Sequence, residues 1–360
     1  MSFSLKLSAW LLAALPLAAH AEAPQPIPLP PVQSSTVLGE TTQGEIRFAS
    51  HTPYDFDVLL EHFDAAPATT SVGTLFLPHG ASAEEPVAAM VVLPGSGGIK
   101  PGREMAYGEM LKNAGHAALV VDYYRSRGVA ESVPYALKTI NVTEYDVVTD
   151  AYAALRALGE HPAVDASRVG VMGMSYGGMA ARLAMDSRVR AVLGDDLSPF
   201  AAHVDVYGPC FQDYRIARTT GAPLLTLRGG EDASNDLVAC ARREGSLREA
   251  GSEVAAVVFA GAGHAWENLE PRHENASAYV QGCEMVFDDR GLPSVNGQAL
   301  IGPELARDRK TRFSQRLKSG EPFADCVKRG YIVGRDEAVK RASDRELLRF
   351  IDKTLAPTTS

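Results

Sequence analysis

A serine stands at the centre of the pentapeptide Gly173-Met174-Ser175-Tyr176-Gly177, directly after the apolar run 169–172 and before a helical pattern. A sharp strand-to-helix turn with serine at its apex leaves no room for a Cβ two residues to either side, which accounts for both glycines. Such a turn holds the hydroxyl where a substrate can reach it. We therefore interpret Ser175 as a nucleophile, in preference to an inert serine in a glycine-rich turn.

A serine hydroxyl needs a base to take its proton, and His264 has the expected setting. It follows the strand-like run 255–259 in the segment Gly261-Ala262-Gly263-His264, where small residues let a loop tip approach the nucleophile. The other histidines lie near the N-terminus, before strand-like runs, or in stretches without this setting. The sequence therefore predicts that His264 is the base.

A carboxylate should orient and stabilise that histidine, and folds of this kind often place the three residues in the order serine, acid, histidine. Asp232 closely follows the apolar run 224–227, at the expected carboxyl end of a strand. Glu231 and Asp236 are its neighbours and competitors, and Asp195 and Asp196 offer an alternative position one strand earlier. We favour Asp232.

Attack on an acyl carbon produces an oxyanion, which needs two pre-placed hydrogen-bond donors. The backbone N–H of Tyr176, next to the nucleophile, is expected to be one of them. The second should come from the segment Leu93-Pro94-Gly95-Ser96-Gly97-Gly98, in which we favour Ser96 and keep Gly97 as the alternative. A phosphate-binding loop is the other interpretation, but the Lys-Ser/Thr pair of such loops does not follow.

The segment 122–127 (DYYRSR) follows another strand-like run, at the sheet edge where a substrate would lie. Arg125 or Arg127 could bind a substrate carboxylate through two hydrogen bonds, and our weaker candidates for substrate binding are Tyr123 and Arg127. A salt bridge to a neighbouring helix is the alternative for the arginines. Tyr123 and Tyr124 could equally line a pocket or pack in the core.

The order of elements predicts an α/β fold with a mostly parallel, eight-stranded sheet covered by helices on both faces. Five helices are expected, at 105–114, 144–158, 176–185, 236–250 and 344–355, the second of them capped by Thr143 with Asp146. Regular patterning is lost at about 268–334, which we interpret as an insertion before the last helix. The expected strands are 45–48, 71–76, 88–93, 117–121, 169–172, 191–193, 224–227 and 255–259.

The N-terminus predicts export. Residues 1–21 combine one lysine, an apolar run and an Ala-His-Ala end, which is typical of a cleaved signal peptide and too short for a membrane anchor. A proline-rich linker, 22–40, should precede a folded domain over 41–360. The net charge of −9 and the lack of a basic run argue against a nucleic-acid partner.

Four cysteines lie in the C-terminal half, and in an oxidising compartment an even number favours disulfides. We expect the pairs Cys210–Cys240 and Cys283–Cys326, since the first joins the loop before the Asp232 strand to the helix after it. The second pair flanks the insertion. Four free thiols are the alternative. No zinc-like spacing occurs, so we expect neither a metal nor a cofactor.

The motifs resemble those of the dienelactone hydrolases and their secreted relatives, within the α/β-hydrolase superfamily. The resemblance covers residues 45–263 and the last helix, through LPGSGG, VVDYYRSRG, VTEYDVVTDAYAALRAL, VGVMGMSYGG, LRGGEDASND and GAGHAWEN. It implies an α/β-hydrolase fold, with Asp232 and His264 as partners of the nucleophile. Dienelactone hydrolase itself has cysteine where this chain has Ser175.

These features predict an exported hydrolase that cleaves a small-molecule carboxylic ester or lactone through an acyl-enzyme on Ser175. A serine peptidase is the alternative enzyme, because the same three residues can cleave amides. A binding protein that keeps the fold without the chemistry is an alternative from another class, although it would not need all three residues in order.

Overall fold

A computed structural model describes residues 24–318 and 320–357; the predicted signal peptide lies outside the described residues. Eight strands form the main sheet, in the spatial order β1-β2-β4-β3-β5-β6-β8-β9. They are β1 (Gly44–His51), β2 (Ala68–Phe76), β3 (Val87–Leu93), β4 (Ala117–Val121), β5 (Val164–Met174), β6 (Ala202–Val206), β8 (Leu224–Gly229) and β9 (Val254–Phe259).

The six strands from β4 to β9 in this order pair in parallel, whereas β1 and β2 add antiparallel strands at one edge. Because parallel strands end at the same edge of a sheet, the loops after β3, β5, β8 and β9 meet there. The predicted α/β-hydrolase fold with a mostly parallel eight-stranded sheet is confirmed.

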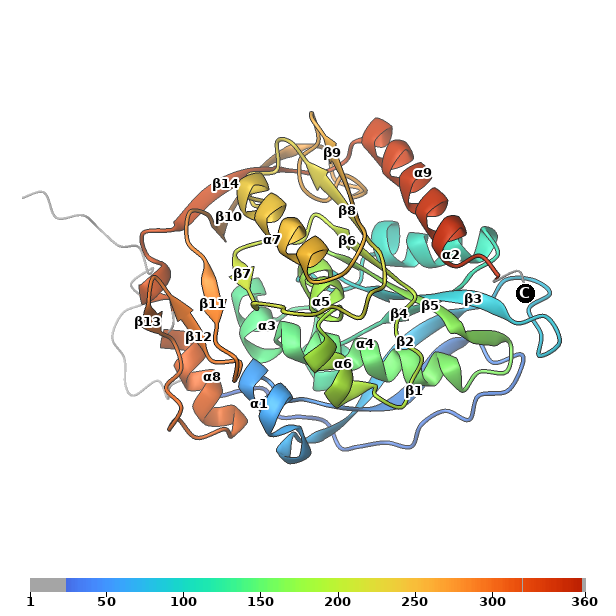
Figure 1. Cartoon of the computed structure of the whole chain (residues 1–360), viewed down its shortest axis with the longest axis horizontal. Coiled ribbons are helices and arrows are strands. Elements are labelled where there is room, and N and C mark those ends of the chain that lie inside the picture. Colours follow the sequence, from blue (N-terminus) through green and yellow to red (C-terminus); the bar gives the residue numbers. More distant parts are fainter. Residues whose placement is uncertain (1–23, 319, 358–360) are drawn as a thin grey trace, which may run out of the picture.

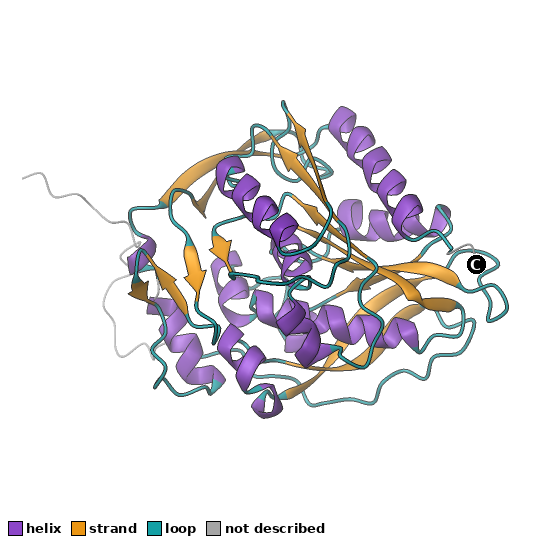
Figure 2. Ribbon diagram, in the orientation of Figure 1, coloured by secondary structure: helices purple, strands orange, loops and turns teal. Residues whose placement is uncertain are grey.

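Helices cover both faces of this sheet (Figures 1 and 2). On one face α4 and α5 contact the central strands, and on the other α2 contacts β4 while α9 contacts β6 and β8. The helices are α1 (Phe56–Glu61), α2 (Ala106–Asn113), α3 (Tyr135–Asn141), α4 (Glu144–Gly159), α5 (Tyr176–Leu183), α6 (Ser187–Leu193), α7 (Leu237–Glu249), α8 (Arg309–Lys318) and α9 (Glu337–Thr354).

The central strands β3 and β4 are apolar throughout because each of their faces packs against helices. Alternate residues of β3 belong to different cores: Ala89 and Val91 pack on the α4 side, and Met90 and Val92 pack on the α2 side. The start of α4 follows the predicted capping pattern, in which Thr143 and the carboxylate of Asp146 bond each other's backbone N–H.

One predicted strand is wrong. Residues 191–193 belong to α6, whose first turn is capped by the Asp186 carboxylate, and the sixth strand is β6, further along the chain. Patterning missed β6 because His203 and Asp205 interrupt its apolar run. Both are fully buried: the His203 ring bonds the Ala181 carbonyl, and burial lowers its pKa to about 4.

Residues 273–333 lie outside the main sheet and form smaller elements against it, which we call the β10–β14 region. Its ends, β10 (His273–Val280) and β14 (Val327–Val333), pair antiparallel, and α8 comes between them in the chain but lies below them in the view of Figure 1. A second small sheet joins β7 (Gln212–Asp213), β11 (Met285–Phe287), β12 (Pro293–Val295) and β13 (Gln298–Ala299).

Both predicted cysteine pairs lie at disulfide distance. The Cα atoms of Cys210 and Cys240 are 5.0 Å apart, and those of Cys283 and Cys326 are 5.7 Å apart. The first pair joins the loop after β6 to α7. The second joins the two ends of the irregular part of the β10–β14 region.

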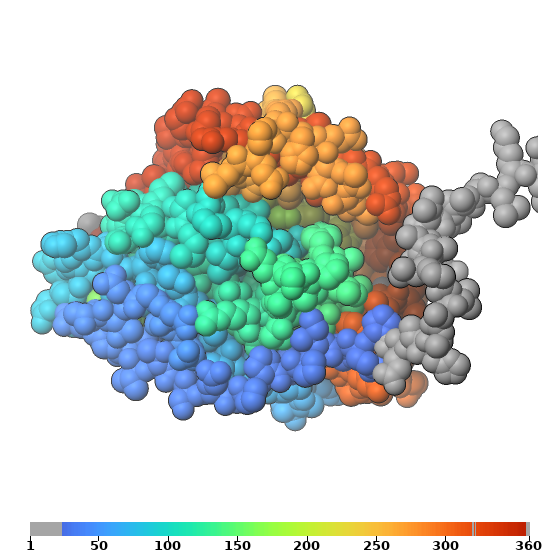
Figure 3. All heavy atoms as spheres, turned by 180° about the vertical axis from the view of Figure 1, so that it is seen from behind, coloured from blue at the N-terminus to red at the C-terminus, as the bar shows by residue number. Residues whose placement is uncertain are grey.

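The proline-rich N-terminal segment forms no helix or strand over residues 24–39, and the dark blue, N-terminal part of the described chain runs along the lower part of the surface in Figure 3. Backbone bonds hold it there, from Ile27 to the side chain of Asn141 and from Gln33 to that of Thr70. Within the described residues, no helix is both long enough and apolar enough to cross a bilayer.

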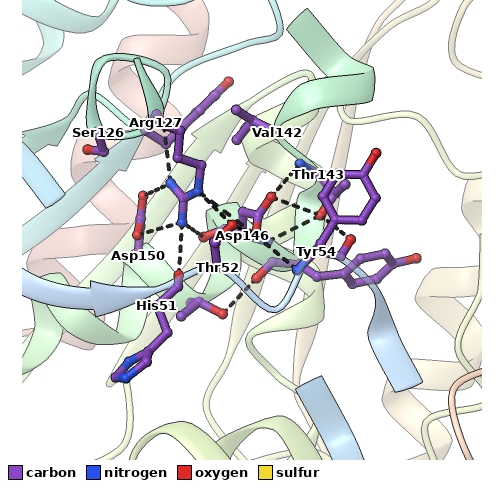
Figure 4. A network of polar contacts seen from close by, with 12 residues as sticks. His51, Thr52, Tyr54, Ser126, Arg127, Val142, Thr143, Asp146 and Asp150 are labelled. Carbon is purple, nitrogen blue, oxygen red and sulfur yellow. Dashed lines mark hydrogen bonds and ion pairs between the residues drawn. The ribbon is translucent and has the colours of Figure 1, made fainter. Parts of the chain in front are cut away.

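Arg127 lies at the centre of a buried polar network rather than at a binding surface (Figure 4). Its guanidinium is fully buried and pairs with the Asp150 carboxylate of α4 at 2.6 and 3.1 Å, and it also bonds the His51 carbonyl of β1. This corrects the expectation that Arg127 binds substrate; the salt bridge to a neighbouring helix is what the structure shows. The network joins α4 to the edge of the sheet.

We predict that Arg127→Met lowers the free energy of unfolding by about 3–5 kcal/mol, because it leaves the Asp150 carboxylate buried without a cation. Arg125→Met is the matched control, since Arg125 pairs with Glu45 at the surface and should contribute about 0–1 kcal/mol. Urea unfolding followed by circular dichroism measures both. Equal losses for the two variants would contradict this account.

Candidate active site

Ser175 occupies a sharp turn between β5 and α5, as predicted. Its φ is 52° and its ψ is −111°, a conformation that a residue with a side chain rarely adopts. A Cβ at Gly173 would lie 2.0 Å from the Gly177 carbonyl oxygen, and one at Gly177 would lie 2.3 Å from that of Leu93. Both glycines are therefore required by the close approach of three backbone segments.

The structure brings Ser175, His264 and Asp232 into one hydrogen-bonded chain. The Nε2 atom of His264 lies 3.0 Å from the Ser175 hydroxyl oxygen, and its Nδ1 lies 2.6 Å from Oδ2 of Asp232. Ser175 is partly exposed, whereas Asp232 is buried. A buried carboxylate that holds a histidine against a reachable hydroxyl is the arrangement that activates serine as a nucleophile.

Several groups hold the Asp232 carboxylate. Its Oδ1 accepts the backbone N–H of Ser234 at 3.0 Å and the Ser234 hydroxyl, and its Oδ2 accepts the side-chain amide of Asn235 at 3.0 Å. The amide oxygen of Asn235 in turn accepts from Arg228 at 2.9 Å. Asp232 therefore has one orientation, with Oδ2 directed at the imidazole.

A buried cluster of ion pairs is connected to the loop that carries Asp232, and sequence reasoning missed this cluster. Asp205 on β6 accepts from Arg182 on α5 and from Arg228 on β8, and Arg228 also bonds Glu244 on α7. Although burial alone would raise it, the two arginines hold the pKa of Asp205 below its usual value. A charged residue inside an apolar strand was the one signal of this cluster in the sequence.

His264 is held by backbone bonds from β14. Its N–H donates to the Ile332 carbonyl at 2.7 Å, and its carbonyl accepts from Gly334 at 3.0 Å. A Cβ at Gly263 would lie 2.6 Å from the same Ile332 oxygen, so the small residue predicted beside the histidine is needed here. The late part of the chain thus positions the candidate base.

The competing acids have other roles. Glu231 pairs with Arg272, Asp236 caps α7 through the N–H groups of Val238 and Ala239, and Asp196 forms an exposed pair with Arg156. Asp195 and Asp196 follow α6 rather than a strand, which corrects their proposed position at the sheet edge.

Two tyrosine hydroxyls hold the loop after β3 through its carbonyls. Tyr123 is buried, and its hydroxyl donates to the carbonyls of Pro94 and Gly95, while the Tyr124 hydroxyl donates to that of Ser96. Tyr123 is thus a packing residue that shapes the loop, not a lining residue, and this corrects the expectation of direct substrate contact.

Two N–H groups of this loop already have acceptors, which leaves fewer candidates for the second oxyanion donor. Within the described residues, the N–H of Gly95 donates to the Glu104 carboxylate at 3.2 Å and that of Gly98 donates to the Gly95 carbonyl at 2.9 Å. Ser96 and Gly97 are the two remaining residues of the turn. Ser96 and Ser175 line one cavity together, and both also line a second cavity with Tyr176. Tyr176 is the first residue of α5, so its N–H has no acceptor within the helix.

The fold and this constellation define an α/β-hydrolase. The model of the dienelactone hydrolase family matches residues 73–288, more than half of the chain. The chain therefore belongs to the dienelactone hydrolase family and is a hydrolase that acts on ester bonds.

Solved structures similar to this chain are esterases and a candidate dienelactone hydrolase. The apo form of Thermogutta terrifontis esterase 2 is 19% identical, with 55% of this chain and 81% of that chain covered and a TM-score of 0.45. The same esterase phosphorylated by paraoxon is 20% identical, covering 54% and 78%, with a TM-score of 0.44. The candidate dienelactone hydrolase, from Klebsiella pneumoniae, is 19% identical, covering 62% and 88%, with a TM-score of 0.44. A comparison with curated protein sequences gives no match.

Glu267 is a second buried carboxyl near the histidine, and no motif or pattern pointed to it. The Tyr207 hydroxyl donates to it, and the Tyr207 ring lies 4.5 Å from the imidazole of His264 between centroids. Burial raises the pKa of Glu267 to about 7. The folded protein therefore holds a proton on Glu267 at pH values at which the unfolded chain has lost it.

We predict that this proton makes stability fall as pH rises. Between the unfolded pKa near 4.5 and the folded value of about 7, only the folded state keeps the proton, so the free energy of unfolding should decrease by up to about 1.4 kcal/mol per pH unit. Glu267→Gln removes this dependence.

Urea unfolding from pH 4.5 to 8 measures the difference between wild type and Glu267→Gln. Glu270→Gln, at an exposed site three residues away, is the matched control and should follow the wild-type curve. A difference between Glu267→Gln and wild type that stays constant over this range would refute the assignment.

Proposed function

We propose that this chain is an exported serine hydrolase that cleaves a carboxylic ester or lactone through an acyl-enzyme on Ser175. The observation that carries the proposal is the continuous chain from Asp232 through His264 to the Ser175 hydroxyl, with hydrogen-bond distances of 2.6 and 3.0 Å. Membership of the dienelactone hydrolase family supports the same reaction class.

In the proposed mechanism, Nε2 of His264 takes the Ser175 proton while the oxygen attacks the acyl carbon. The N–H groups of Tyr176 and Ser96, or Gly97 in place of Ser96, stabilise the oxyanion. The imidazolium then protonates the departing alkoxide, which leaves the acyl group on Ser175. Water, deprotonated by the same histidine, releases the acid and restores the serine. Asp232 orients the imidazole and stabilises its charged form.

We predict that Ser175→Ala and His264→Ala each lower kcat/KM for p-nitrophenyl acetate by on the order of 10³-fold or more, because nucleophile and base act as a unit. Asp232→Asn should cause a loss of similar order. His273→Ala and Asp196→Asn, at exposed sites outside the constellation, are the controls and should retain wild-type activity.

A labelled fluorophosphonate should modify wild type and the two controls but not Ser175→Ala. Full labelling of Ser175→Ala, or unimpaired turnover by it, would show that another residue is the nucleophile. Thermal unfolding of each variant confirms that the fold is intact.

Export is supported by the pattern of residues 1–21 and by the two cysteine pairs at disulfide distance. We predict that the full chain, expressed in a bacterium, is recovered from outside the cytoplasm with Glu22 as its first residue. Peptide mapping without reduction should find Cys210 linked to Cys240 and Cys283 linked to Cys326. An intact N-terminus, or four alkylatable thiols, would contradict this proposal.

A further inference from the structure

Two cavities meet at Ser175. One, of about 590 Å³, is lined by His264 together with Lys100, Asn268 and Tyr331. The other, of about 330 Å³, is lined by Tyr176 and Met179 of α5, and His264 does not line it. Ser96 and Ser175 line both. In the space-filling view, the residues near 100, near 135 and at 268–280 face one another across a recess (Figure 3).

We infer that the two cavities bind the two halves of an open-chain ester, the alcohol in the larger one and a medium-length apolar acyl group in the smaller one. The inference rests on the proposed acyl-enzyme at Ser175 and deepens it by naming the substrate class. Three observations carry it: the position of the base, the lining of the smaller cavity, and the divergence of the two spaces from one serine.

The position of the base decides which half lies where. When the tetrahedral intermediate collapses, the bond between the acyl carbon and the alcohol oxygen breaks, and that oxygen takes the proton from Nε2 of His264. The alcohol oxygen must therefore face His264. This histidine lines the larger cavity and does not line the smaller one. The acyl chain leaves the carbonyl carbon in the other direction, past Tyr176, into the smaller cavity.

The lining of the smaller cavity selects an uncharged acyl group. Its walls are largely apolar, and include Ile140, Met179, Met285, Leu300, Ile301 and Phe323.

The charged residues that line this cavity are Asp55, Glu144 and Arg316, and each of them lies in an ion pair. Asp55 lies 3.8 Å from Arg316 and 3.4 Å from Arg312. The Glu144 carboxylate accepts from the Tyr176 hydroxyl at 2.9 Å, from Gln212, and from Arg316 at 3.1 Å. Burial opposes it, but Arg316 and these hydrogen bonds hold the pKa of Glu144 below its usual value. The Arg316 guanidinium also lies over the Tyr145 ring, 5.9 Å from its centroid. A charged acyl group would have to disrupt this set, whereas a hydrocarbon chain gains from the walls.

The divergence of the two cavities favours an open-chain ester over a small lactone. In a small lactone the acyl and alcohol carbons are tied into one ring, so they cannot extend in opposite directions from the carbonyl. Such a ring would fill part of one cavity and leave the other without substrate. An open-chain ester can occupy both.

The first test keeps the alcohol constant and varies the acyl group, with p-nitrophenyl acetate, butyrate, hexanoate and octanoate. We expect kcat/KM to rise about three- to fourfold per methylene until the cavity is full, because each buried methylene adds binding in the transition state. A flat or falling series from acetate to hexanoate would overturn the proposal.

Two matched variants test which cavity binds the acyl group. Ile301→Trp obstructs the smaller cavity and should lower the ratio of hexanoate to acetate kcat/KM at least tenfold, whereas Ala278→Trp, which lines the larger cavity alone, should leave this ratio unchanged. The opposite pattern would show that the acyl group binds beside His264. If Ile301→Trp fails to fold, the wild-type acyl series and the lactone comparison still test whether the substrate is an open-chain ester with an apolar acyl group.

The lactone comparison uses δ-valerolactone and ethyl hexanoate, each rate being divided by the rate of hydrolysis by hydroxide. The ester should be favoured at least tenfold, and a lactone preference would overturn the open-chain assignment. Failure of the proposed function looks different: wild type would then hydrolyse none of these substrates, or Ser175→Ala would hydrolyse them equally well.

Discussion

The candidate site depends on the close contact of backbone around Gly173 and Gly177. These two glycines let the end of β5, the start of α5 and the end of β3 approach to distances that a Cβ would prevent. That contact places the Ser175 hydroxyl, the first N–H of α5 and the loop after β3 within one small space. A side chain at either glycine would separate the nucleophile from the donors expected to stabilise the oxyanion.

The acid and the histidine are brought to this point by different means. Buried charge holds the acid, since Asp205 and Arg228 join β6 to β8 and Asn235 carries the connection to Asp232. Backbone pairing holds the histidine, through the bonds between His264 and β14. The β10–β14 region therefore has two roles, because it supports the proposed base and also supplies walls to both cavities.

The sequence predicted those parts of the molecule whose residues repeat a local rule. The strands of the main sheet apart from β6, the cap of α4 and the turn at Ser175 each follow from periodicity, capping or steric requirement. The rest depends on partners far away in the chain. Arg127 follows a strand whose end was expected to face the substrate, yet its guanidinium pairs with Asp150 of α4. Asp205 made β6 hard to recognise as a buried strand, because its charge is compensated by Arg182 and Arg228, which are distant in sequence. The cavities have no local signature, since they are bounded by segments from residue 55 to residue 333.

The bonds from β14 to His264 have a consequence for the order of biosynthesis. Serine, acid and histidine all lie within the first 264 residues, and the family match ends at residue 288, yet the carbonyl and N–H that hold the histidine loop belong to residues 332 and 334. A nascent or truncated chain that ends before β14 contains all three residues of the proposed site but lacks these backbone bonds to His264. The loop that carries His264 therefore gains this support only when the C-terminal tenth of the polypeptide, which contains β14, has been made and has docked beside it.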